Sequence, residues 1–146
     1  MAAIEDALTE LADEFDLLGD WEERYRYVID LGGDLAPLTD DERSDANKVR
    51  GCASQVWLVT EPQADATVEF RGDSDAHLVK GLIAVLLQLF SGQHAADIAA
   101  YDTKAALDRL GLGSMLTPQR SNGLASMANR IRTDAERLAA HPTSSS

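Results

Sequence analysis

Apolar side chains recur at intervals of three and four over the first 33 residues, which is the spacing of one face of an α-helix. The first run extends from Ile4 to Leu18 and ends at Gly19. The second begins after Asp20, a residue type that caps helices, and ends at Gly32 and Gly33. Its apolar positions are Trp21, Tyr25, Val28 and Ile29. The pattern predicts two amphipathic helices in succession.

The period then changes from 3.6 to 2. Residues 34–47 have few apolar anchors and read as a loop, whereas residues 55–60 and 66–71 are β-branched, aromatic or alternating. Residues 61–65 contain a proline and fit the connection of a hairpin. We expect Asn47–Arg50 to form a third antiparallel strand, which places the following loop between two strands. Trp57 is expected in the core.

A turn at residues 72–75 precedes an almost wholly apolar segment, residues 76–90, which predicts a buried central helix. We expect Asp73 and Asp75 in this turn to cap that helix. Shorter helical segments follow at residues 95–101 and 103–110. A final helix begins near Pro118 or Ser121, and its predicted inner face comprises Leu124, Met127, Ala128, Ile131, Ala135 and Leu138. The whole pattern is that of an α+β fold with helices packed around one small sheet.

The length of 146 residues fits a single domain, which we expect to span residues 1–141, with a flexible serine-rich tail at residues 142–146. The longest apolar segment, Leu82–Phe90, is far shorter than the roughly 20 residues of a membrane span. The first residues lack the basic and apolar segments of a signal peptide. These features favour the cytoplasm and exclude a membrane as a partner.

Negative charge is concentrated in the first third of the chain. The net charge is −12, and residues 1–45 hold fifteen acidic residues and three arginines. From residue 46 onward ten acidic residues balance ten basic ones. Such a field repels phosphate backbones, so the sequence excludes nucleic acid as a partner and favours a basic protein surface. Individually, most of these acids are expected to lie on solvated helix faces.

Cys52 is the single cysteine, and its neighbours are small or polar rather than apolar. Glycine precedes it, and alanine and serine follow it, so the thiol is expected to be presented on a loop, although an inert buried cysteine is the alternative. One thiol cannot supply the paired ligands of a zinc site or of an iron–sulfur cluster. The three histidines have no nearby partner residues in the sequence, and no metal or cofactor is expected.

Three stretches closely resemble the signature blocks of the SufE family of sulfur acceptors. They are Gly51–Trp57, the segment that begins Gly72-Asp73-Ser74-Asp75-Ala76 and continues through Val79–Ala84, and Leu116–Leu124. Trp21–Tyr25 and Ile29–Gly32 are similar to the second helix of that family as well. The resemblance spans almost the full chain, in order and at comparable spacing. It implies the α+β fold shared by SufE and NifU.

The resemblance also implies a role in the biogenesis of iron–sulfur clusters. Members of the family accept sulfur from a SufS-type, pyridoxal-phosphate-dependent cysteine desulfurase, increase its turnover, and pass the sulfur to a SufBCD-type scaffold. Cys52 matches the cysteine that carries the persulfide. The chain itself would need no cofactor, and it would act as a monomer or a homodimer.

Further site residues are assigned on weaker grounds. We expect Arg50, Gly51, Ser54 and Gln55 to shape the cysteine loop and to support the thiolate, because cations and backbone amides lower the pKa of a thiol. Asp73, Asp75 and Arg120 are candidates for partner binding or for holding the loop at rest. An ion pair between Arg120 and one of these aspartates is the alternative.

Two other functions remain open at this point. The chain would be a binding module that activates a desulfurase without accepting sulfur, or a thiol redox sensor that forms a sulfenic acid or a mixed disulfide. Because sulfur acceptance depends on a partner enzyme, the sequence leaves open whether the chain is an enzyme in its own right.

Overall fold

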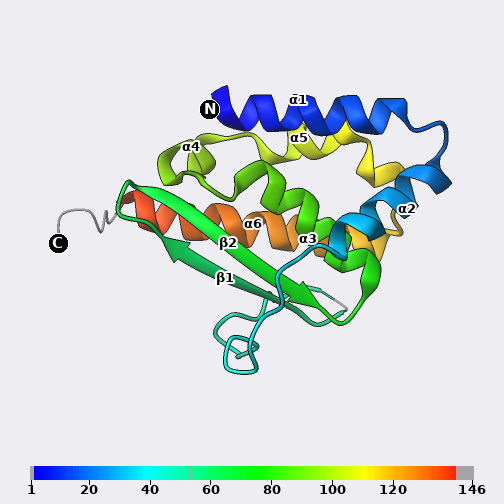
Figure 1. The fold of residues 1–146 in the computed structure, drawn as a ribbon. Coiled ribbons are helices and arrows are strands. Elements are labelled where there is room, and N and C mark those ends of the chain that lie inside the picture. The colour runs from blue at the N-terminus through cyan, green and yellow to red at the C-terminus, as the bar shows by residue number, and fades with distance from the viewer. Residues whose placement is uncertain (1, 53, 141–146) are drawn as a thin grey trace.

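The structure is a computed structural model that describes residues 2–52 and 54–140, so the expected tail at residues 142–146 lies outside the described residues. Figure 1 shows its helices and strands in chain order. They are α1 (Ala2–Leu17), α2 (Trp21–Gly32), β1 (Val56–Pro62), β2 (Thr67–Ser74), α3 (His77–Phe90), β3 (Gln93–His94), α4 (Ala95–Ala100), α5 (Thr103–Leu110), the short 3₁₀-helix η1 (Leu112–Ser114) and α6 (Pro118–Ala140).

Helices α2 and α6 begin where the sequence signals predict. The Asp20 carboxylate accepts a hydrogen bond from the Glu23 amide at the start of α2, and the Glu23 side chain accepts one from the Gly19 amide. Pro118 occupies the first position of α6, and the Thr117 hydroxyl accepts from the Arg120 amide. These contacts satisfy amide groups that the first turn of a helix leaves without partners.

The sheet is antiparallel, in the order β1-β2-β3, and confirms the predicted α+β class. The first two strands pair over seven positions, from Val56 opposite Ser74 to Pro62 opposite Val68. In the core, β2 contacts α3, and β1 contacts α6. The central helix α3 is buried almost throughout, as predicted, and its largest fully buried side chains are Leu82, Ile83, Leu86, Leu89 and Phe90.

The third strand is not where the sequence placed it. Asn47–Arg50 forms an isolated bridge between Lys48 and Trp57 rather than a strand, and the third strand is instead Gln93–His94, paired with Thr67 and Val68. Two residues are too few for alternation to mark them as a strand. The pairing is fixed by the chain reversal after α3, where the Gly92 amide donates to the Val68 carbonyl.

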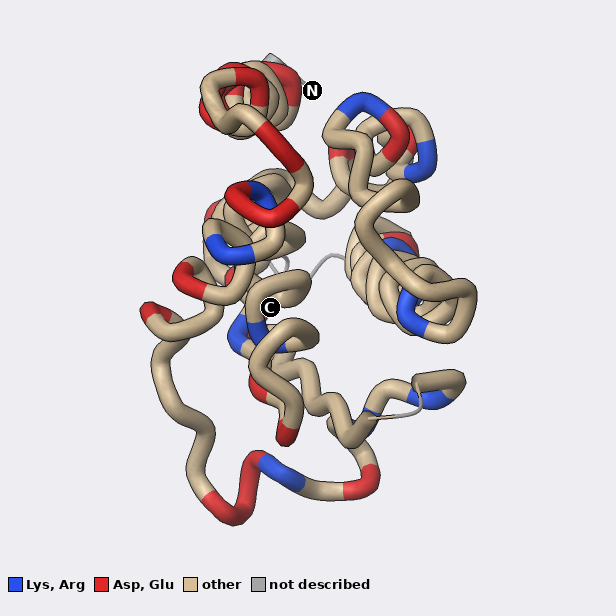
Figure 2. Tube along the Cα trace, turned by 90° about the vertical axis from the view of Figure 1, so that its right-hand side faces the viewer, with Lys and Arg blue, Asp and Glu red and all other residues tan. Residues whose placement is uncertain are grey.

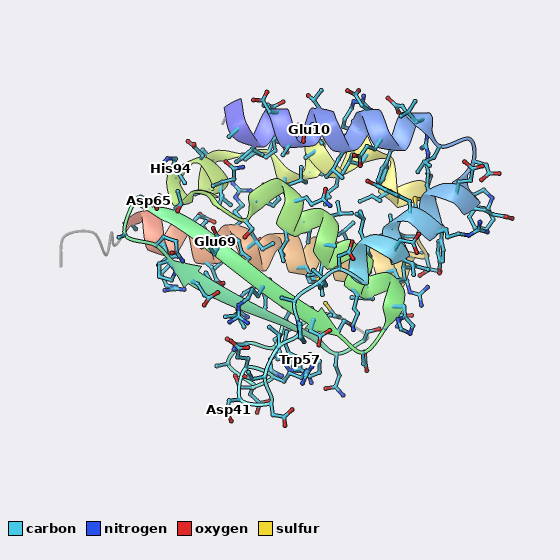
Figure 3. All side chains as sticks on the ribbon, in the orientation of Figure 1. Glu10, Asp41, Trp57, Asp65, Glu69 and His94 are labelled. Carbon is cyan, nitrogen blue, oxygen red and sulfur yellow. The ribbon has the colours of Figure 1, made fainter. Side chains whose placement is uncertain are left out.

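The predicted capping turn is also wrong, because residues 72–74 continue β2 and α3 starts after Ala76 without a side-chain cap. Trp57 is a further correction, since it is only half-buried. Val56 and Leu58 point into the core, so alternation directs Trp57 to the opposite face of β1. Figure 3 shows this side chain toward the 34–47 loop that carries Asp41.

Helices α2 and α3 cross at two glycines. A Cβ atom at Gly81 of α3 would lie 2.1 Å from the carbonyl oxygen of Val28, and one at Gly32 of α2 would lie 2.6 Å from the Gly81 amide nitrogen. Only glycine allows backbones to approach this closely. The crossing therefore fixes α3 against α2, and α3 forms one wall of the site described next.

Candidate functional site

Cys52 lies on a loop that packs against the first half of α6. Its thiol donates a hydrogen bond to the Gly123 carbonyl oxygen, with 3.6 Å between sulfur and oxygen. One turn further along α6, the Ser126 hydroxyl oxygen would lie 2.6 Å from a Cβ atom at Gly51. Gly51 has φ +88°, which is costly for any other residue. A glycine before the cysteine is therefore required both by backbone conformation and by the close approach to α6.

The half-buried thiol borders a cavity of about 100 Å³ between the loop, α3 and α6. Its lining combines apolar side chains from α3 and α6 with polar side chains from the loop and from the first turn of α6. The lining residues are Cys52, Ser54, Val79, Leu82, Gln119, Arg120, Gly123, Leu124 and Met127. Two of the sequence-predicted residues, Ser54 and Arg120, are thus brought to the thiol.

Burial raises the pKa of the Cys52 thiol above its ordinary value. Within residues 2–52 and 54–140, neither Arg50 nor Arg120 forms an ion pair, and both are exposed. The alternative ion pairs of Arg120 with Asp73 or Asp75 are therefore not formed among these residues. In this conformation burial favours the protonated thiol over the nucleophilic thiolate.

Asp75 holds the end of the loop that follows the cysteine. Its carboxylate accepts a hydrogen bond from the Gln55 amide at 3.1 Å, and its own amide donates to the Gln55 carbonyl oxygen at 3.3 Å. Gln55 thus takes part through its backbone, not through its side chain. These two contacts continue the β1–β2 pairing by one residue beyond Val56 and Ser74.

A clamp that the sequence reasoning missed holds the segment before the loop. Arg130 of α6 donates hydrogen bonds to the carbonyl oxygens of Ala46 and Lys48, at 3.0 and 3.2 Å. Its guanidinium also pairs with the buried Asp134, which accepts a hydrogen bond from Thr60 of β1. One signal in the sequence could have revealed this clamp. Asp134 directly precedes Ala135, which lies on the predicted inner face of the final helix, and a carboxylate at such a position needs a partner because unpaired buried carboxylates are rare.

Asp73 has a different role from Asp75. Its side chain is 11% exposed and pairs with Arg43 of the 34–47 loop at 2.9 Å and with Lys80 of α3 at 3.4 Å. Burial alone would raise the pKa of this carboxyl group, but hydrogen bonds from Arg43, from the Ser74 amide and from Lys80 lower it. Asp73 therefore ties β2, α3 and the 34–47 loop together near the start of the cysteine loop.

The family model described as the Fe-S metabolism associated domain of SufE matches residues 9–135, which is most of the chain. The chain belongs to the SufE family. It is 50% identical, over 137 residues, to an uncharacterized SufE-like protein of Rhizobium etli, with 92% of this chain and 93% of that protein covered. It is 47% identical, over 133 residues, to an uncharacterized SufE-like protein of Rhizobium meliloti, with 89% and 95% covered. SufE membership assigns the chain a role in iron–sulfur metabolism.

A solved structure supports the fold. The solution structure of a hypothetical protein from Thermus thermophilus superposes with a TM-score of 0.76 over 92% of this chain and 96% of that one. The two sequences are 16% identical, so this likeness concerns the fold alone. Within the described residues no helix is long and apolar enough to cross a membrane. The same part of the chain brings together no group of three or more His, Cys, Asp or Glu side chains able to hold a metal ion.

Proposed function

We propose that the chain is a sulfur acceptor and carrier for a SufS-type cysteine desulfurase, in the cytoplasm, and that it passes the sulfur to a SufBCD-type scaffold. The observation that carries the proposal is the position of Cys52 on a short glycine-containing loop whose two ends are held, by Arg130 before the cysteine and by Asp75 after it. A thiol that must reach a partner's sulfur needs such a loop, anchored at both ends.

The chemical step exchanges one sulfur–sulfur bond for another. The Cys52 thiolate attacks the terminal sulfur of a cysteine persulfide on the desulfurase, a new bond forms between the two sulfurs, and the donor cysteine leaves as its thiolate. No net oxidation or reduction occurs, and no second thiol of this chain is present to convert the product into an internal disulfide.

The resting contacts explain why transfer would depend on a partner. With the thiol half-buried and its pKa raised, Cys52 is expected to react slowly with small molecules. Outward movement of the loop breaks the contact with Gly123 and restores solvent to the sulfur. We assign Arg120 to the docking surface beside the cysteine, where its exposed cation can stabilise the arriving persulfide.

The experiment is mass spectrometry of the intact chain after incubation with the desulfurase from the same organism and cysteine. We expect a gain of one sulfur atom that a reducing agent reverses and that Cys52→Ser lacks. The serine hydroxyl of this variant is not a usable nucleophile at neutral pH, because a hydroxyl is far less acidic than a thiol.

Desulfurase turnover measured on the same samples separates the alternatives. If Cys52→Ser stimulates turnover as well as the unchanged chain does, the protein is a binding-only activator. A mass gain that matches oxygen, obtained without the desulfurase, identifies a redox sensor instead. Arg120→Ala is expected to fold normally and to slow transfer, whereas Arg132→Ala, at an exposed position further along α6, serves as its control.

A further inference from the structure

The start of α2 exposes apolar side chains that the helical pattern alone would place inside. Trp21 is 61% exposed and Leu17, four residues earlier, is 85% exposed. Among the described residues, these two are the large apolar side chains that face solvent. Trp21 stacks edge to face on Tyr25, with 6.4 Å between ring centroids. Two exposed large apolar side chains only four residues apart in the sequence are unusual on a surface that has no partner.

The tryptophan borders an open hollow of about 470 Å³ on the outer side of α2. Its lining comprises Trp21, Glu22, Tyr25, Arg26 and Ile29. Trp21, Tyr25 and Ile29 are spaced four residues apart, so they form one stripe, which we call the α2 stripe. Val28 and Gly32, which pack against α3, lie on the same half of the helix, beside the stripe. Tyr25 and Ile29 are half-buried against the core, so Trp21 is the member of the stripe that remains exposed once α2 has made this contact.

The surroundings of the α2 stripe are strongly acidic. Residues 2–32 contain ten acidic residues and two arginines. Figure 2 shows the acidic residues along α1, along the connection to α2 and along α2 itself. Pairing this face with a second copy of the chain would bring like charges together, and an anionic membrane or nucleic acid would be repelled. Charge complementarity leaves a basic protein surface with an apolar centre.

Helix α2 packs against α3, which lines the cysteine cavity. The crossing of Gly32 and Gly81 joins α2 to α3, and Val79 and Leu82 of α3 line the cysteine cavity. A protein that covers Cys52 and Arg120 would therefore reach α2 if its interface has the usual dimensions.

We propose that the α2 stripe is a second docking surface for the desulfurase, which meets it with an apolar side chain surrounded by Lys and Arg. This inference rests on the proposed function and adds to it a contact remote from the reacting sulfur. The apolar stripe provides affinity, and the acidic residues around it provide orientation and speed of association. The acids of α1 alone, by contrast, act only through long-range attraction.

The test measures the dissociation constant for the desulfurase at about 0.05 M and about 0.5 M salt, because salt screens charge but not apolar contact. We expect Trp21→Ala to raise it by at least about tenfold at both concentrations, as truncation of a buried interface aromatic does. Glu22→Arg should raise it and Arg26→Glu should lower it, each by about threefold at low salt and much less at high salt. Leu107→Ala, in a groove between α5 and α6, is the matched control and should bind like the unchanged chain.

Sulfur acceptance by Cys52 separates this inference from the proposed function. Trp21→Ala should accept sulfur slowly at low desulfurase concentration and normally at saturation, since Trp21 does not line the cysteine cavity. If the unchanged chain binds and accepts sulfur while Trp21→Ala binds equally well, the docking surface is wrong and the proposed function stands. If the unchanged chain neither binds nor accepts sulfur, both are wrong. A dimer of the isolated chain that Trp21→Ala dissociates would also overturn the inference.

Discussion

The sulfur of Cys52 and the backbone of Gly123 are in direct contact. The thiol donates to the Gly123 carbonyl oxygen, and a Cβ atom at position 123 would lie 3.7 Å from that sulfur. This is an ordinary van der Waals separation, so a methyl group fits, whereas a larger side chain would extend into the cavity that the thiol borders. Position 123 therefore offers a way to change the environment of the thiol without touching the loop itself.

Gly123→Ala should raise the free energy of unfolding by up to about 1 kcal/mol, because alanine favours a helix interior over glycine. Gly123→Leu should instead fill the cavity and displace Cys52 outward. We expect its alkylation by iodoacetamide to be several times faster than that of the unchanged chain. Calorimetry and the alkylation rate check these outcomes. A leucine variant that is alkylated no faster would show that the cavity does not hold the thiol.

Asp75→Ala should increase the alkylation rate of Cys52 with a loss of only about 1 kcal/mol in stability, because it removes one hydrogen bond to the Gln55 amide. Asp73→Ala should instead lower stability more and increase the alkylation rate less. It strands Arg43 and Lys80 and removes a buried carboxylate, so a larger loss of about 2–3 kcal/mol is expected with a smaller effect on the thiol. Equal alkylation rates in the two variants would contradict the assignment of loop holding to Asp75.

The raised pKa of Cys52 makes stability depend on alkaline pH. The folded chain binds the thiol proton more tightly than the unfolded chain does, so this contribution is complete below the unfolded pKa of about 8.5. It is lost as the pH rises from there through the folded value. The free energy of unfolding should therefore fall more steeply above about pH 8.5 in the unchanged chain than in Cys52→Ser. Parallel curves would mean that burial does not perturb the thiol.

Gly81→Ala should be severely destabilising, by about 3 kcal/mol or more, because its Cβ atom would lie 2.1 Å from the Val28 carbonyl oxygen. Neither backbone can move without separating α2 from α3. Gly113→Ala is the control, since nothing lies within 4 Å of its added atom. Thermal unfolding followed by circular dichroism distinguishes the two. A melting temperature close to that of the unchanged chain would show that the helices tolerate a wider crossing.

The spacing of apolar residues predicted those helices and strands in which the spacing repeats over many residues. Periodicity found α1, α2, α3 and α6, and alternation found β1 and β2, because each of these buries one face or stripe along its length. The third strand was misplaced because Lys48 and Val49 resemble a strand locally but meet β1 at one bridge, while Gln93 and His94 carry no alternation. Which short segment pairs with a sheet is decided by tertiary structure.

In the candidate site, too, the sequence indicated which residues matter but not their tertiary contacts. The family resemblance marked Cys52, Arg120 and Asp75, but the sequence could not say what each one contacts. The turn pattern predicts helix caps at both Asp73 and Asp75, whereas Asp75 bonds the cysteine loop and Asp73 pairs with a loop arginine and an α3 lysine. Arg130 was missed because a charged pair four residues apart on a helix looks like a solvated surface. Its contact with two loop carbonyl oxygens depends on a segment more than 80 residues away.

The close contact of α2 with α3 at two glycines fixes a distance that matters for any protein that binds both α2 and the cysteine site. Because the two backbones touch at Gly32 and Gly81, the span from Trp21 on α2 to the Val79 and Leu82 wall of the cysteine cavity is fixed. The two helices therefore keep Trp21 and the cysteine cavity at one distance from each other. Under the docking proposed above, a desulfurase held at Trp21 would have to present its persulfide at that distance, and an enzyme whose reactive loop is shorter or longer would not reach Cys52.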